Sequence, residues 1–157
     1  MMATTGSVER EGQLAVPRDF AFSYVADYRN IPKWMYGVSS IEPYGDKTYG
    51  EGALFDTSFT GGVTAITFRL ATIDWQDGQL IALKSVRGPD VSARFEFERH
   101  DEDKTLFRVG IGYPMLGGLA GRALRKVNDM LVGQAVRHVE TNLRREVEAA
   151  FVAERRT

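Results

Sequence analysis

Three polar residues near the C-terminus, Gln134, His138 and Asn142, recur at steps of four and are the first candidates for acid-base chemistry. A spacing of four places side chains along one side of an α-helix. The imidazole of a histidine titrates near neutral pH, so His138 can accept or donate a proton, while the two amides can orient a carbonyl group. Two placements stay open: these side chains face an interior pocket, or they lie at the margin of the buried face, in water.

Three further residues complete the candidate catalytic set with His138: Tyr36, Arg87 and Tyr113. Tyr113 ends a predicted strand, where its hydroxyl could donate to a ligand carbonyl or satisfy a backbone group. Strand alternation directs Ser85 and Arg87 inward. Because Arg87 stands beside a turn, the sequence favours a buried stem with an exposed guanidinium for this residue.

Composition excludes several other chemistries. The chain has no cysteine and two histidines, so we expect no disulfide, no metal site and no cofactor. Its Gly-x-Gly segments lack the lysine and helix context of phosphate-binding loops. A formal net charge of -1 gives no electrostatic attraction to nucleic acid. The N-terminus lacks a targeting pattern and no run approaches the roughly 18 apolar residues of a membrane span, so we expect a cytoplasmic protein without integral membrane association.

The element that must position these residues is a long amphipathic helix at residues 114–152. Its apolar residues recur almost always four apart: Leu116, Ala120, Leu124, Val127, Leu131, Ala135, Val139, Leu143 and Val147. An ideal turn takes about 3.6 residues, so this apolar stripe moves gradually around the helix. Such a drift suits a helix that crosses a twisted sheet diagonally, and we therefore expect a sheet as its partner.

The preceding chain predicts that sheet. With 157 residues, we expect a tail at 1–6 and one domain at 7–153. Apolar periodicity and Gly or Pro turns predict a strand at 7–16, helices at 17–26 and 31–35, and strands at 38–44, 53–59, 63–75, 79–87, 91–100 and 105–113. The fold class is α+β: a curved antiparallel sheet of six to seven strands, in the order β-α-α-β6-α, wrapped on the long helix.

Alternation in two strands shows which face is covered. Phe95 and Phe97 fall on one side of their strand, as Phe107 and Val109 do on the next. One helix cannot fill the concave side of such a sheet, so the sequence predicts a pocket. Trp34 and Tyr36 would grip a ligand at its mouth or plug the space between helices and sheet. The residues expected to contact a ligand are Trp34, Tyr36, Phe55, Phe59, Phe68, Leu83, Ser85, Phe95, Phe97, Val109, Leu124, Val127, Leu131 and Gln134.

The sequence resembles the START-like helix-grip (SRPBCC) superfamily, in particular its polyketide cyclase/dehydrase and lipid-transport group. The resemblance covers nearly the whole chain and rests on AVPRDFAFSYVADYRNIPKW at 15–34, GEGALF at 50–55, FEFERHDEDKTLFRV at 95–109 and GGLAGRAL at 117–124. It implies an apolar ligand held between the sheet and the long helix. The family's cyclases use pocket arginines and tyrosines to orient a poly-ketone. Val38 and Ala71-Thr72 stand where we would look for such groups and supply neither, with Tyr36 and Arg69 as substitutes only in another register, and this departure counts against classical aromatic-polyketide cyclisation.

Three functions follow as hypotheses. The first is a domain, monomeric or homodimeric, that binds a polyketide, a lipid or an aromatic metabolite. The second is a cofactor-free cyclase, aromatase or dehydratase that works by general acid-base catalysis in the same cavity. The third is a co-chaperone-like interaction module, which would show an exposed apolar patch and no closed pocket.

Overall fold

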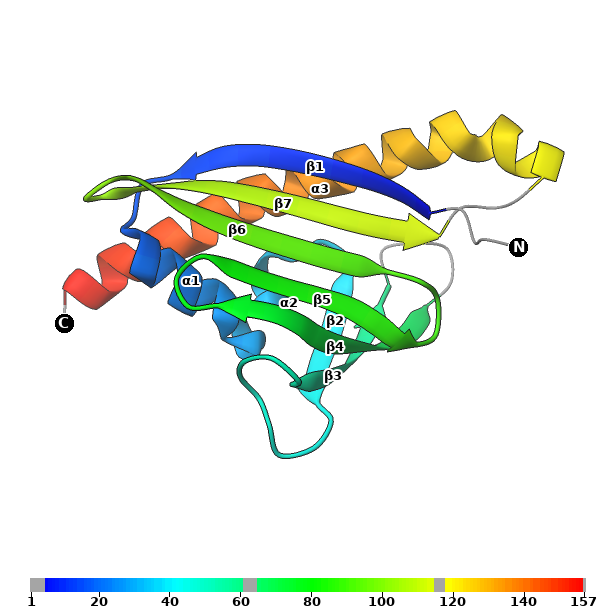
Figure 1. The fold of residues 1–157 in the computed structure, drawn as a ribbon. Coiled ribbons are helices and arrows are strands. Elements are labelled where there is room, and N and C mark those ends of the chain that lie inside the picture. The colour runs from blue at the N-terminus through cyan, green and yellow to red at the C-terminus, as the bar shows by residue number, and fades with distance from the viewer. Residues whose placement is uncertain (1–4, 61–64, 115–117, 157) are drawn as a thin grey trace.

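The structure is a computed structural model that describes residues 5–60, 65–114 and 118–156, without the side chains of residues 5 and 114–135. Seven antiparallel strands form one sheet in the order β1-β7-β6-β5-β4-β3-β2 (Figure 1). This is the predicted α+β order. The elements are β1 (Thr5–Leu14), α1 (Arg18–Ala26), η1 (Tyr28–Asn30), α2 (Ile31–Trp34), β2 (Val38–Pro43), β3 (Leu54–Phe59), β4 (Ile66–Gln76), β5 (Leu80–Arg87), β6 (Ser92–Asp101), β7 (Lys104–Pro114) and α3 (Gly118–Arg155).

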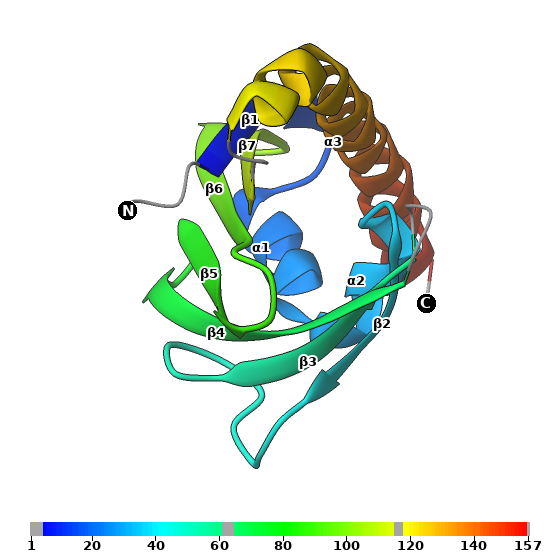
Figure 2. The same cartoon turned by 90° about the vertical axis from the view of Figure 1, so that its right-hand side faces the viewer.

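The sheet curls strongly, and α3 lies along the gap between its two ends (Figure 2). The helices α1 and α2 lie inside the curl, towards one end of it. Two irregularities in the pairing of β4 with β5, at Arg69/Leu70 and at Thr72/Asp74, accompany this curvature. Such bulges bend a strand and increase its local twist, and the second brings Trp75 opposite Ile81. The sheet thus encloses a concave face, as the sequence predicts.

Element ends differ from the predicted ones by a few residues. Thr5 and Gly6 belong to β1 rather than to the expected tail. The long helix continues past Val152 to Arg155. The turn at Tyr28–Asn30 that leads into α2 is a 3-10 turn, and the side chain of Asp27 caps it by accepting a hydrogen bond from the Arg29 backbone N–H at 3.0 Å.

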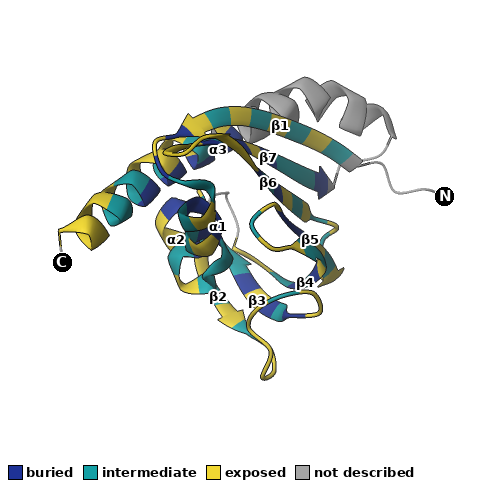
Figure 3. Cartoon of the chain, turned by 60° about the vertical axis from the view of Figure 1, so that its left-hand side comes forward, coloured by how far each residue is buried: buried dark blue, intermediate teal, exposed yellow. Residues whose placement is uncertain are grey.

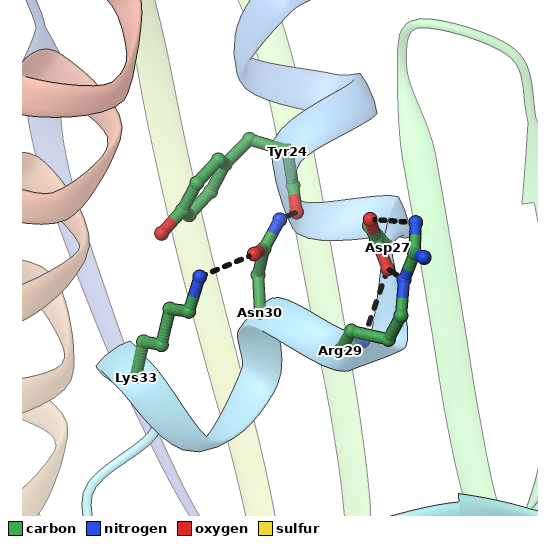
Figure 4. Close-up of polar contacts among 5 residues, drawn as sticks. All are labelled: Tyr24, Asp27, Arg29, Asn30 and Lys33. Carbon is green, nitrogen blue, oxygen red and sulfur yellow. Dashed lines mark hydrogen bonds and ion pairs between the residues drawn. The ribbon is translucent and has the colours of Figure 1, made fainter. Parts of the chain in front are cut away.

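Polar contacts fix the joint between α1 and α2 (Figure 4). The Arg29 guanidinium donates to both carboxylate oxygens of Asp27, at 2.9 and 2.8 Å, and this hydrogen bonding lowers the pKa of Asp27. The Asn30 side-chain amide donates to the Tyr24 carbonyl at 3.1 Å and accepts from Lys33 at 3.2 Å. The joint holds α2 in place across the concave face.

The core lies between the second half of α3, the helix α1 and the inner faces of β6 and β7. On α3 the residues Val136, Val139, Leu143 and Val147 are all buried, which matches the predicted stripe over its last three members (Figure 3). Fully burying one such side chain stabilises the fold by about 1.5–3 kcal/mol. Thr105 adds a buried hydrogen bond from its hydroxyl to the carbonyl of Val16, at 2.8 Å.

Candidate functional site: an apolar recess on the concave face

An apolar recess lies between the α1–α2 region and the inner faces of β2 to β6. Its volume is about 30 Å³, and its walls include Val25, Ile31, Ile41, Phe55, Leu83 and Phe95. One water molecule takes about 30 Å³ of the liquid, whereas ligand pockets typically measure about 300–1,000 Å³. A ligand that enters from this recess must therefore displace side chains that now fill the concave face.

The mouth of the recess is covered by aromatic rings. Tyr49, 55% exposed on the β2–β3 loop, lies edge to face on Trp75 with 4.4 Å between ring centroids. Tyr28 of η1 lies over Phe55 with a centroid distance of 5.6 Å. The indole N–H of Trp75 donates to Asp77 at 2.6 Å, which fixes the ring on which Tyr49 rests. The Tyr49 cover belongs to a loop, and loop segments move more readily than strands.

Two polar atoms on the interior side have no hydrogen-bond partner among the described residues. One is Nε1 of Trp34, a residue with 0% exposure, and the other is Oγ1 of Thr57, with 3% exposure. Trp34 packs edge to face on Phe95 at 5.6 Å. Thr57 shares its strand face with Phe55 and pairs with Ile41, so both orphan atoms border residues that line the recess. A buried donor or acceptor without a partner costs about 1–3 kcal/mol.

Arg10 is a cation on the same concave face. It pairs with Val109, which is buried in the core, and opposite residues in an antiparallel pair share one face. Arg10 is partly buried and forms no ion pair with a described residue. Arg10 was not among the predicted site residues, although the alternation of Val8, Arg10, Gly12 and Leu14 along β1 indicates its face.

The structure brings several predicted ligand-contact residues together. Phe55, Leu83 and Phe95 line the recess, and Trp34 lies directly behind Phe95. The remaining predicted residues are placed as follows: Phe97 and Val109 are packed in the core, Phe59 and Phe68 lie further along the inner faces of β3 and β4, Ser85 accepts a hydrogen bond from the Val91 N–H at 3.0 Å, and the side chains of Leu124, Val127, Leu131 and Gln134 lie outside the described residues.

The predicted catalytic residues do not all meet. Tyr36 and His138, both exposed, stack with 5.5 Å between centroids and 24° between ring planes. Tyr113 is buried at the end of β7, with its ring against Gly6 of β1. Arg87 is exposed at the end of β5, which matches the favoured reading of an exposed head. Only the first two of the four candidates therefore form a local pair.

Among the described residues, neither Arg69 nor a metal-binding group adds a charged site to this recess. Arg69 pairs with Asp56 at 2.8 Å and lies over the ring of Tyr44, on the strand face opposite to Leu70. Among the described residues, no group of three histidine or acidic side chains could hold a metal ion. Within the same part of the chain, no helix combines the length and apolar character needed to cross a membrane.

Several solved structures superpose on nearly the whole of this chain. The chain superposes on the Zhui aromatase/cyclase from Streptomyces sp. R1128 with a TM-score of 0.75 and 15% identity, over 92% of this chain and 94% of that one. A protein from Thermus thermophilus superposes with a TM-score of 0.79 and 18% identity, over 92% of this chain and 99% of that one. A START superfamily protein from Mycobacterium smegmatis superposes with a TM-score of 0.71 and 18% identity, over 92% of this chain and 98% of that one. No protein-family model and no curated protein sequence matches the chain. The chain has the helix-grip fold of START-like proteins, as predicted.

Proposed function

We propose that this protein binds a small or medium apolar molecule, such as a polyketide, a lipid or an aromatic metabolite, on the concave face between the sheet and α3. The observation that carries the proposal is the apolar recess behind the cover formed by Tyr49 and Tyr28. The unpartnered interior atoms of Trp34 and Thr57 support it, because a fold that needed only a core would bury apolar atoms there.

Burial of the ligand provides the driving force. A ligand that removes about 300 Å² of apolar surface from water gains about 7 kcal/mol before the costs of binding. Those costs include lost rigid-body freedom and the movement of side chains that now occupy the recess. Moderate affinity is therefore expected for a purely hydrocarbon ligand, and polar contacts have to supply selectivity.

Native mass spectrometry of protein purified without detergent tests the proposal. The expected result is a co-purified apolar compound that organic solvent extracts and that rebinds to the stripped protein. The test variant is Leu83→Gln, which places an amide in the wall of the recess and should reduce loading. The matched control is Lys84→Gln, which changes an exposed neighbour on the same strand and should leave loading unchanged. Equal loading of wild type and Leu83→Gln, or a protein that never carries or rebinds an apolar compound, would argue for the interaction module instead.

A cyclase or dehydratase is the second candidate, favoured by the contact between Tyr36 and His138. A phenol and an imidazole side by side can hold and transfer a proton near a carbonyl group. Two of the structures that resemble this chain are described as aromatase/cyclase proteins. Single-turnover assays on candidate poly-ketones should show reduced product with His138→Ala and with Tyr36→Phe. Unchanged product in both variants would remove the acid-base assignment and leave the binding function intact.

A further inference from the structure

We infer that the ligand carries a hydrogen-bond acceptor, a carbonyl or ether oxygen, which takes the indole N–H of Trp34. The inference rests on the proposed function, because it names the chemical class that the same concave face selects. Trp34 has 0% exposure, and Nε1 has no acceptor among the described residues. A buried donor loses its hydrogen bond to water on folding, and no acceptor among the described residues replaces that bond.

The second tryptophan of the chain shows the contrast. Trp75 lines the recess itself, whereas Trp34 lies against the lining residue Phe95, and the Nε1–H of Trp75 donates to Asp77 at 2.6 Å. Among the described residues, the indole N–H at the rim thus has a hydrogen-bond partner and the interior one has none. An acceptor brought by the ligand would complete the hydrogen bonding of Trp34 only in the bound state. The free energy of that hydrogen bond would therefore favour ligands that carry the acceptor over those that lack it.

The surroundings of Trp34 make this acceptor a neutral one. Phe95, which lies against the indole, and the other walls of the recess are mostly hydrocarbon, and a carboxylate would lose its hydration there with one neutral donor in exchange. Thr57 supplies a hydroxyl on the strand face that borders the same recess and can donate to a second oxygen. A ketone, ester or ether on an apolar skeleton fits these groups.

One alternative lies within the protein itself. The edge of an indole can donate weakly to the face of an aromatic ring, and Trp34 lies edge to face with Phe95 at an interplanar angle of 79°. In that case the N–H needs no ligand. The two accounts differ in whether Trp34 distinguishes a ketone from a hydrocarbon of the same shape.

The experiment uses 2-acetylnaphthalene and 2-ethylnaphthalene, which differ by a carbonyl in place of a methylene group. Dissociation constants for both probes are measured with the wild type and with Trp34→Phe, which keeps an aromatic ring and removes the N–H. The preference for the ketone should fall by about tenfold in the variant, the value of one net hydrogen bond. The differing water solubility of the probes cancels, because it is the same for both proteins.

NMR of the wild type labelled with 15N in the tryptophan indoles provides a readout that does not depend on the stability of the variant. The Trp34 indole proton should move downfield with the ketone and not with the hydrocarbon, while that of Trp75 stays in place with both. Identical Trp34 shifts for the two probes, or an unchanged preference in Trp34→Phe, would overturn the inference and leave the proposed function standing. Failure of both probes to bind would overturn both.

Discussion

Thr57 and Thr105 offer a matched pair of substitutions that tests the reasoning about interior polar atoms. Both are buried on the inner face of the sheet, with 3% and 0% exposure. The hydroxyl of Thr105 donates to the Val16 carbonyl at 2.8 Å, whereas that of Thr57 has no partner among the described residues. Valine has nearly the same shape as threonine and keeps the β-branched side chain that strands favour.

The two Thr→Val changes should therefore have opposite signs. Thr105→Val removes a hydrogen bond and leaves a buried carbonyl unsatisfied, which should lower the free energy of unfolding by about 1–3 kcal/mol. Thr57→Val removes a desolvated hydroxyl and should raise it by about 1 kcal/mol. For a chain of this size each kcal/mol corresponds to a shift of about 2–4 °C in Tm.

Urea unfolding at neutral pH, followed by circular dichroism, measures both differences, and equal m-values confirm that only stability has changed. Thr57→Val should also weaken binding of a ligand that carries a second oxygen, so the same variant would gain stability and lose affinity. A loss of about 1 kcal/mol or more in Thr57→Val would refute the reasoning, because it would show that the hydroxyl already has a favourable partner.

Two further predictions concern the backbone and acid stability. Gly37 has φ of +86°, and an added Cβ would press on the Phe59 ring, while Gly45 has φ of +100° with nothing within 4 Å of an added Cβ. Gly37→Ala should therefore lower the free energy of unfolding by about 2 kcal/mol or more, and Gly45→Ala by about 1 kcal/mol. Equal losses of the two variants in thermal unfolding would contradict the contact with the ring. Arg29 lowers the pKa of Asp27, so this carboxylate stabilises the fold above the unfolded pKa of about 3.9 and the contribution disappears as pH falls through the lower folded pKa. Asp27→Asn should reduce stability at pH 7 and flatten the decline in acid, and parallel urea midpoints for wild type and variant between pH 2 and 7 would contradict this.

The order of elements could be predicted because its signals are local. Apolar periodicity and the glycine turns predicted seven strands and three helical segments, and the stripe through Val139, Leu143 and Val147 predicted the buried face of α3. The pairing irregularity at Thr72/Asp74 was not predicted, because it depends on how β4 meets β5. A strand sequence alone does not show where its partner is one residue short.

The candidate site was harder to predict than the fold. Phe95 was correctly placed on the covered face of its strand, because alternation decides that. The lack of a partner for the Trp34 N–H among the described residues could not be foreseen, since satisfaction of a buried N–H depends on every group packed around it. The stack of Tyr36 on His138 joins two segments about a hundred residues apart and has no local signal.

The position of α3 also protects the sheet from self-association. β1 ends the sheet at one side, and its outer edge would otherwise present unpaired backbone groups to another chain. The helix lies beside this strand (Figure 1), and the lack of a side chain at Gly12 leaves room for the Glu140 side chain there. A chain shortened before Gly118 would expose this edge and the apolar residues of the concave face together. Such a fragment is expected to form β-rich oligomers, so α3 serves the solubility of the fold as well as the enclosure of the concave face.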